Sequence, residues 1–279
     1  MGSQAKDVLV TTEWLAEHRD DPRLVVAEVD ENPALYDEGH IPGAVKLHWK
    51  EDLQDPLIRD VVKKDRFEEL LGERGIRNDT TVVLYGDKNN WFAAYAYWYL
   101  KTYGHEDVRL LDGGRTKWIE EGREMTKEAP APAAASYSAK DRDESIRVRR
   151  DEVLAKLGVD AVALVDVRSP PEYAGELVAP PGYEQEGASR TGHIPGAQSI
   201  PWATAVRDDG TFKAVDELAE IYRDKAVAPE KEVLTYCRIG ERSAHTWFVL
   251  HELLGYDNVR NYDGSWTEWG NLVDVPIER

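Results

Sequence analysis

Short apolar runs alternate with longer stretches of helical periodicity along the whole chain. The runs are rich in valine and leucine and lie between polar turns, which is typical of strands buried in a parallel sheet. In the last helical stretch, Gly255 marks the end of the helix. Strands are expected at 24–29, 81–85, 162–167 and 232–236, and helices at 66–72, 91–103, 215–223 and 243–254. This alternation predicts an α/β fold in which a mainly parallel sheet is flanked by helices.

The chain also repeats itself at a long interval. The hexapeptide GHIPGA occurs at 39–44 and again, letter for letter, at 192–197, an offset of 153 residues. Residues 104–118 align with residues 255–269 at an offset of 151, and seven of the fifteen pairs are identical. A period near 150 residues is too long for a solenoid repeat. It indicates one domain present in two tandem copies.

The boundary between the two copies is visible in the composition. Residues 128–136, EAPAPAAAS, are rich in proline and alanine and lack an amphipathic period, as in a semi-extended linker. A length of 279 residues is also about what two domains require. We therefore expect a first domain at 1–125, a linker at 126–137 and a second domain at 138–279.

Charge and composition exclude several classes of function. With 35 Lys and Arg against 53 Asp and Glu, the net charge of −18 disfavours binding to nucleic acid. No apolar run approaches 18 residues and the start resembles no signal peptide, so a cytoplasmic protein without a membrane partner is expected. A single cysteine, Cys237, excludes an intrachain disulfide and a multi-cysteine zinc site. No metal or cofactor motif is present, and neither is expected.

The surroundings of Cys237 favour a reactive sulfur. The cysteine follows the strand expected at 232–236, and a helix is expected to begin near Ser243, so Cys237 faces the amino end of a helix at a ligand-binding sheet edge. Gly240 allows the loop amides to converge, and Arg238 and Arg242 add positive charge. These features predict a depressed pKa for the Cys237 thiol. A lone cysteine in a core is the alternative, and the arginines disfavour it.

The first copy serves as an internal control for the second. At the offset of 151, Cys237 aligns with Gly86, Arg238 with Asp87 and Arg242 with Trp91, so the first copy lacks the nucleophile. Features shared by both copies, including His193 and its counterpart His40, are expected to be architectural, with each histidine bonded within its turn. Functional residues should therefore lie among the features that only the second copy has.

Four further features occur in the second copy, and three of them leave alternatives open. Trp266 forms either a pocket wall or core, and Arg168 either reaches a substrate anion or pairs with Glu172. The sequence SPPE at 169–172 fits a capping box, which gives Glu172 a structural role. The insertion at 174–191 is either a lid or a decoration.

The duplicated GHIPGA, the segment YCRIGERS and the closing NYDGSWTEWG together resemble the two-domain rhodanese family, most closely its actinobacterial thiosulfate sulfurtransferases. The resemblance covers nearly the whole chain. It implies two tandem rhodanese-like domains, an inactive first and a catalytic second, and a ping-pong reaction through a persulfide on Cys237. The family's six-residue active loop maps onto Cys237–Arg242. The substrate-binding residues implied or suspected are Arg238, Ile239, Gly240, Glu241, Arg242, Ser243, Arg168 and Trp266.

The resemblance also bears on the substrate. An arginine directly after the cysteine, here Arg238, favours thiosulfate, whereas a glycine-rich loop is typical of members that use 3-mercaptopyruvate. The chain departs from vertebrate-like members at Ile239, where they often have a basic residue, and at Glu172, where they have a substrate-binding arginine. Anchoring should then fall on Arg238, Arg242 and Arg168. Against the net charge of −18, a dianion requires a locally positive pocket.

The expected function is transfer of the sulfane sulfur of thiosulfate to cyanide or a thiol, because no second cysteine can resolve the persulfide within the chain. A 3-mercaptopyruvate sulfurtransferase is the first alternative. A non-catalytic sulfur carrier that serves a protein partner is the second. A cysteine-dependent phosphatase is disfavoured, because its C-x5-R loop would need an arginine where this chain has Ser243.

Overall fold

The computed structural model describes residues 8–183 and 187–279, and the chain divides into two compact units. The first unit runs to residue 143 and includes 206–212, and the second comprises 144–205 and 213–279. Each unit is an α/β domain with a parallel sheet, as the alternation of apolar runs and helical stretches predicted. Among the described residues, no helix is both long and apolar enough to cross a membrane.

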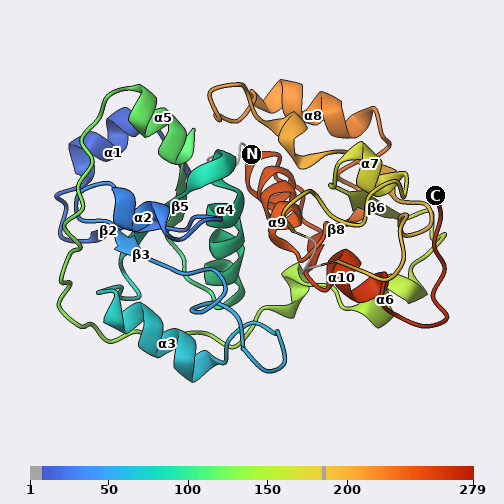
Figure 1. Ribbon diagram of the computed structural model, residues 1–279, viewed down its shortest axis with the longest axis horizontal. Helices are drawn as coiled ribbons and strands as arrows, with labels where there is room; N and C mark the ends of the chain where they lie inside the picture. The colour runs from blue at the N-terminus through green and yellow to red at the C-terminus, as the bar shows by residue number, and fades with distance from the viewer. Residues whose placement is uncertain (1–7, 184–186) are drawn as a thin grey trace. The chain divides into compact units, whose positions relative to one another are not determined.

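The first unit is built on a five-stranded parallel sheet with the order β1-β5-β4-β2-β3. The central strand β4 (Thr81–Tyr85) lies between β5 (Val108–Leu111) and β2 (Leu24–Glu28), and the short strands β1 (Leu9–Val10) and β3 (Val45–Lys46) form the edges. The helices of this unit, shown in Figure 1, are α1 (Thr12–His18), α2 (Leu35–Glu38), α3 (Lys64–Glu73), α4 (Asp87–Thr102) and α5 (Gly114–Glu120).

The second unit repeats this plan with four parallel strands in the order β7-β6-β8-β9. They are β7 (Gln198–Ser199), β6 (Val162–Asp166), β8 (Glu232–Tyr236) and β9 (Val259–Tyr262). The register pairs the last residues of β6, β8 and β9, so the loops that follow these strands leave the sheet at one edge. The helical elements are η1 (Glu144–Ile146), α6 (Arg150–Ala155), α7 (Pro170–Tyr173), η3 (Trp202–Ala205), α8 (Val215–Arg223), α9 (Glu241–Phe248), η4 (Val249–Leu253) and α10 (Ser265–Trp269) (Figure 1).

The sequence pattern located most of these elements closely. Strands β4 and β8 and helix α8 have the predicted bounds. The helix predicted from Trp91 begins earlier, at Asp87, and contains left-handed residues at 88–90. The helix predicted from Ser243 begins at Glu241 and continues as the π-helical η4 before Gly255, which has a φ of 69°. Boundaries therefore differ where a loop has its own backbone conformation.

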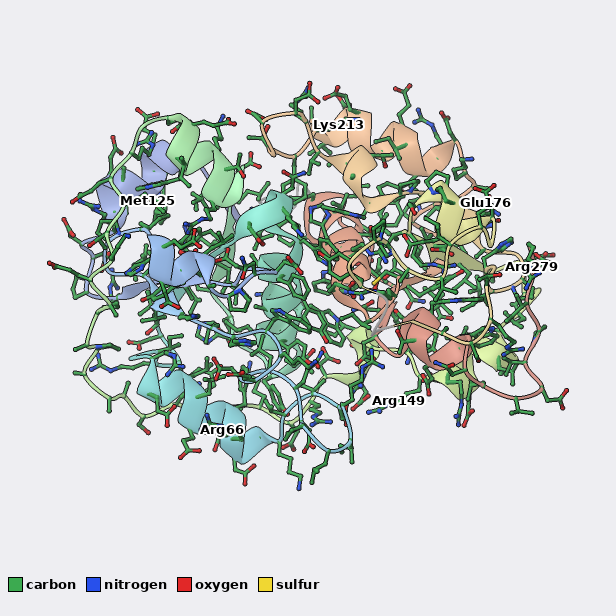
Figure 2. The ribbon with its side chains drawn as sticks, viewed as in Figure 1. Arg66, Met125, Arg149, Glu176, Lys213 and Arg279 are labelled. Carbon is green, nitrogen blue, oxygen red and sulfur yellow. The ribbon has the colours of Figure 1, made fainter. Side chains whose placement is uncertain are left out.

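Helix α3 shows how the apolar period sets the orientation of a surface helix. Phe67, Leu70 and Leu71 are completely buried on its inner face. Arg66, labelled in Figure 2, lies on the outer face, where its guanidinium bonds the Glu69 carboxylate at 2.7 Å. Burial of the three apolar side chains supplies the stability of this helix, because exposed ion pairs contribute little.

The two GHIPGA turns are fixed in the same way in both units. The ring of His40 stacks on Tyr36 with 3.8 Å between centroids, and the ring of His193 stacks on Tyr173 at 3.7 Å. In each case the histidine Nδ1 lies 2.9 Å from the carbonyl oxygen of the same tyrosine. The expectation that each histidine is bonded within its turn is confirmed.

The proline- and alanine-rich segment is extended but packed. The Ala135 N–H donates to the Gly72 carbonyl oxygen at 2.9 Å, and a Cβ at Gly72 would lie only 2.5 Å from the Ala135 oxygen. Residues 126–143 thus belong to the first unit.

Candidate active site

The loop that carries Cys237 joins β8 to α9 by a sharp turn. The strand ends at Tyr236 and the helix begins at Glu241, so only four residues connect them. Gly240 precedes the helix with a φ of 96°, and a Cβ there would lie 2.6 Å from the Cα of Asp263. Only glycine combines this conformation with this close approach. The turn brings the cysteine to the amino end of α9, as the sequence predicted.

Cys237 is completely buried and held from several sides. Its Sγ accepts the Gly240 N–H at 3.2 Å, and its thiol donates to Oε2 of Glu241 at 3.1 Å. Its own N–H donates to the Ser265 hydroxyl at 3.0 Å, and its carbonyl oxygen accepts the Trp266 N–H at 3.1 Å. The sulfur is therefore fixed in position by the next loop as well as by its own.

The expected depression of the Cys237 pKa is wrong for this structure. Burial raises the thiol pKa above its ordinary value, and the neighbouring Glu241 carboxylate raises it further, while Arg242 acts in the opposite direction. The prediction counted the arginines and the helix but neither the complete burial nor the acid one turn away. Burial and the Glu241 carboxylate therefore both favour the thiol over the thiolate.

Arg242 is paired with a carboxylate that the sequence had assigned to a cap. Its Nη1 and Nη2 donate to the two oxygens of Glu172 at 2.8 and 3.0 Å. Glu172 also forms the predicted capping box with Ser169. Burial of Glu172 opposes its ionisation, but Arg242 and Ser169 outweigh it and lower its pKa to about 2. Glu172 thus has two structural roles, and it holds Arg242 in place.

Arg238 is covered by the insertion at 174–191. Its guanidinium lies 4.6 Å from the centroid of the Tyr183 ring, and its Nη1 donates to the Tyr183 carbonyl oxygen at 3.4 Å. Its Nη2 lies 3.5 Å from Oε1 of Glu241. Residues 184–186 of the insertion lie outside the described residues. The described part contacts the active loop.

The four charged side chains of the site balance. Arg238 and Arg242 are matched by Glu172 and Glu241, whose side chains are completely buried. The positive pocket was expected from the two arginines and the loop amides, and the two acids offset the charge of the arginines. A dianion entering it would meet no net positive charge while both acids are ionised.

Arg168 and Trp266 are bonded within the interior of the second unit. Arg168 pairs with Asp166 at 2.6 Å, not with Glu172 as one alternative held, and it donates to the Gly192 carbonyl oxygen at 2.7 Å. Trp266 belongs to the hydrophobic core, and the Arg168 guanidinium lies 4.5 Å from its ring centroid. The core alternative for the Trp266 side chain agrees with this packing, while its main-chain N–H bonds Cys237.

Two residues that hold the loop escaped the sequence reasoning. Asn261 donates from Nδ2 to the Gly240 carbonyl oxygen at 3.0 Å and accepts from the Ser243 hydroxyl at 2.7 Å. Ser265 accepts the Cys237 N–H while its own backbone is left-handed, with a φ of 53°. Its counterpart in the first copy is Gly114. The presence of serine in one copy where the other has glycine could have drawn attention to this position in the sequence.

The other loop residues have local roles. Ile239 is buried, and its N–H donates to Oε2 of Glu241 at 3.1 Å. Among the described residues, no group of three or more His, Cys, Asp or Glu side chains is arranged to hold a metal ion. The chemistry of the site therefore rests on one sulfur, two acids and two guanidinium groups.

A model of the rhodanese-like domain matches the chain twice, at residues 11–121 and 149–272. The chain belongs to the rhodanese family. Its relatives include proteins named as thiosulfate sulfurtransferases, so the chain is a rhodanese-type sulfurtransferase. The second match contains the whole loop around Cys237.

Named relatives are similar over nearly their full length. The chain is 57% identical to the sulfur carrier protein TtuD of Thermus thermophilus, over 100% of this chain and 99% of the relative. It is also 57% identical to a protein of Mycolicibacterium smegmatis named "Putative thiosulfate sulfurtransferase", over 98% of each chain. These names give two different uses of one rhodanese scaffold.

Solved structures with the same arrangement include the anaerobic ergothioneine biosynthesis enzyme of Chlorobium limicola. It aligns with a TM-score of 0.85 and 28% identity, over 99% of this chain and 71% of that enzyme. A structure of EanB, with a TM-score of 0.86 and 27% identity over 100% of this chain and 72% of EanB, contains a cysteine persulfide.

Proposed function

We propose that this sulfurtransferase takes the sulfane sulfur of thiosulfate onto Cys237 and passes it to cyanide or a thiol in a ping-pong reaction. The observation that carries the proposal is the position of the sulfur, at the carboxyl end of β8 with the Gly240 N–H directed at it. A donor amide at this point stabilises negative charge on sulfur. The persulfide recorded in EanB supports the same intermediate for a related loop.

In the first half-reaction the Cys237 thiolate attacks the outer sulfur of thiosulfate. A new S–S bond forms, the bond between the two thiosulfate sulfurs breaks, and sulfite leaves with the electron pair. The enzyme then carries Cys237–S–S⁻. In the second half-reaction an external nucleophile takes the outer sulfur and returns the thiolate, since the sequence contains no other cysteine.

Substrate must displace part of what covers the site. Cys237 is completely buried and Arg238 is covered by Tyr183, so we propose that Tyr183 moves away from Arg238 when thiosulfate enters. Arg238 then exchanges a weak carbonyl contact for the charged oxygens of the substrate. Arg242 contributes its charge from a fixed position, because Glu172 holds both of its terminal nitrogens.

A sulfur carrier that delivers persulfide to a protein acceptor is a second candidate. The relative TtuD is named a sulfur carrier protein, and it is as similar to this chain as the relative from Mycolicibacterium smegmatis that is named for thiosulfate. In this case the first half-reaction is unchanged and only the acceptor differs. A 3-mercaptopyruvate donor has less support, because Arg238 follows the cysteine where such enzymes have glycine.

The test is mass spectrometry of the intact protein after exposure to each donor. Thiosulfate should add one sulfur atom, about 32 Da, to the wild type and nothing to Cys237→Ser. Steady-state rates with thiosulfate and 3-mercaptopyruvate, each with cyanide and with a small thiol, then rank the donors and acceptors. No adduct on Cys237, or a clear preference for 3-mercaptopyruvate, would overturn the proposal. Persulfide formation without turnover to small acceptors would favour the carrier.

A further inference from the structure

Glu241 is a completely buried carboxylic acid in direct contact with the nucleophile. Its Oε2 lies 3.1 Å from Sγ of Cys237 and accepts the Ile239 N–H at 3.1 Å. Its Oε1 has no hydrogen bond and lies 3.5 Å from Arg238 and 3.8 Å from Arg242. Burying a carboxylate is costly, and a neutral side chain of similar shape would fill this space more cheaply. The acid therefore needs a reason to be present.

The duplicated unit shows what the loop requires when no cysteine is present. The residue aligned with Glu241 at the offset of 151 is Asn90, and the residue aligned with Cys237 is Gly86. Asn90 accepts the Gly86 N–H through Oδ1 at 3.0 Å and donates to the Leu111 carbonyl oxygen. An amide is thus sufficient to hold this part of the fold, and a carboxylic acid occurs in the copy that contains the thiol.

The charges of the site also call for a proton acceptor at this point. With a neutral thiol, the two arginines and two acids sum to zero, so a thiolate beside an incoming dianion would leave a net charge of −3 in a buried site. Glu172 is bound by Arg242 and Ser169 and stays ionised. Glu241 is the acid in contact with the sulfur, and its protonation would lower the excess negative charge by one.

We infer that Glu241 is the catalytic base of the sulfur-accepting step, an inference that rests on the proposed function. The Cys237 S–H bond breaks as its proton moves to Oε2 of Glu241, leaving a thiolate and a neutral acid. The thiolate forms the S–S bond and sulfite departs with the electron pair. The acid then returns its proton to sulfite, which leaves as bisulfite, and Glu241 is again a carboxylate.

The inference has a consequence for pH dependence that a structural role lacks. When one proton is shared inside a coupled pair, the fraction of thiolate paired with neutral acid does not change with pH until the pair gains or loses a proton. The wild-type rate of persulfide formation should therefore be flat from about pH 6 to 8. When the base is absent, the proton must go to solvent, and the rate should rise about tenfold per pH unit.

The experiment measures single-turnover sulfite release and, separately, alkylation of Cys237 by iodoacetamide, from pH 5.5 to 9.5. Glu241→Gln should show the tenfold slope in both and react about 10²-fold more slowly than wild type at pH 6. Glu241→Asp should keep the flat profile at a reduced rate. Glu232→Gln, an acid-to-amide change at the start of β8, is the control and should leave the profile unchanged.

Parallel wild-type and Glu241→Gln profiles, separated by a constant factor, would overturn the inference and leave Glu241 a structural role. Should Glu241→Gln fail to fold, as judged by circular dichroism, the wild-type alkylation profile decides alone: a tenfold rise per pH unit from pH 6 overturns it. Alkylation needs no sulfur donor. A flat alkylation profile without sulfite release would support proton sharing between Cys237 and Glu241 and would contradict the proposed function instead.

Discussion

The loops after β4 and β8 begin at matching points of two related sheets and differ in what they can hold. The first loop passes through three left-handed residues at 88–90, whereas the second reaches its helix through Gly240, its one residue with a positive φ. Both make the same bond to the next loop: the Arg115 N–H donates to the Gly86 carbonyl oxygen, and the Trp266 N–H donates to that of Cys237. The shared sheet edge permits a reactive site but does not require one.

The buried charges differ between the copies as well. In the second unit, Arg168 follows strand β6. At the corresponding place after strand β2, the first unit has Asp30, which lies close to Glu28 and Asp87. Burial, followed by the neighbouring Glu28, raises the pKa of Asp30 to about 9. The first unit therefore has buried acidic side chains beside a loop that contains no cysteine. The two copies thus share backbone hydrogen bonds at this sheet edge but differ in the titratable side chains that they place there.

The largest effect is expected from moving the nucleophile from one loop to the other. Cys237→Ser should lower sulfur transfer by at least ~10³-fold, and adding Gly86→Cys should not restore it. A Cβ at Gly86 would lie 2.1 Å from the Val29 carbonyl oxygen, so a cysteine there must displace backbone. Sulfite release and intact mass are the measurements. Any gain of the double variant over Cys237→Ser would show the first loop to be competent.

Loss of the buried ion pair should destabilise the protein in either unit, but only its loss in the second unit should slow sulfur transfer. Arg242 pairs with Glu172 and Arg115 with Glu28, and both carboxylates are completely buried. Loss of either arginine should lower the free energy of unfolding by about 3–5 kcal/mol, measured by urea titration, because a buried acid loses its partner. Arg242→Ala should also slow persulfide formation. An equal slowing of persulfide formation in folded Arg115→Ala protein would contradict this difference between the units.

Asp30 gives the first unit a pH dependence that Arg168 cannot give the second. Because the pKa of Asp30 is raised to about 9, the folded unit keeps a proton that the unfolded chain releases above about pH 4. Stability is fully present below that pH and should fall as the pH rises toward 9, by up to about 1.4 kcal/mol per pH unit. Asp30→Asn should flatten this fall in urea midpoints measured from pH 5 to 8. An unchanged slope would assign it to other groups.

The smallest effect is expected at Ser265, where the first copy has Gly114. Ser265→Gly relieves a left-handed serine, worth about 1 kcal/mol, but removes the acceptor of the Cys237 N–H, which costs about 1–3 kcal/mol. Net stability should fall by no more than about 2 kcal/mol, and persulfide formation should slow several-fold. Ser265→Ala keeps the strain and loses the bond, so it should be the less stable variant; the reverse order would exclude this account.

Much of the site followed from local sequence. The apolar run before Cys237, Gly240 and the arginines located the loop, because a strand, a sharp turn and a helix start each leave a signal within a few residues. The partners of those arginines did not follow, because Glu172 lies 70 residues from Arg242 and was fully explained by its own capping box. For Arg168 the sequence left substrate binding and pairing with a neighbour open, and the fold pairs its guanidinium with Asp166 at the end of β6.

The sequence by itself determined the duplication, the α/β class, the copy that carries the single cysteine and the loop that contains it. The tertiary structure alone decided how deeply that cysteine is buried and which charged groups surround it. The pKa of Cys237 depends on burial and on the 3.1 Å contact with Glu241, and neither is a property of residue order. Electrostatic free energies vary with distance and solvent access, so two arginines beside a cysteine predict a thiolate only until the fold places two acids with them.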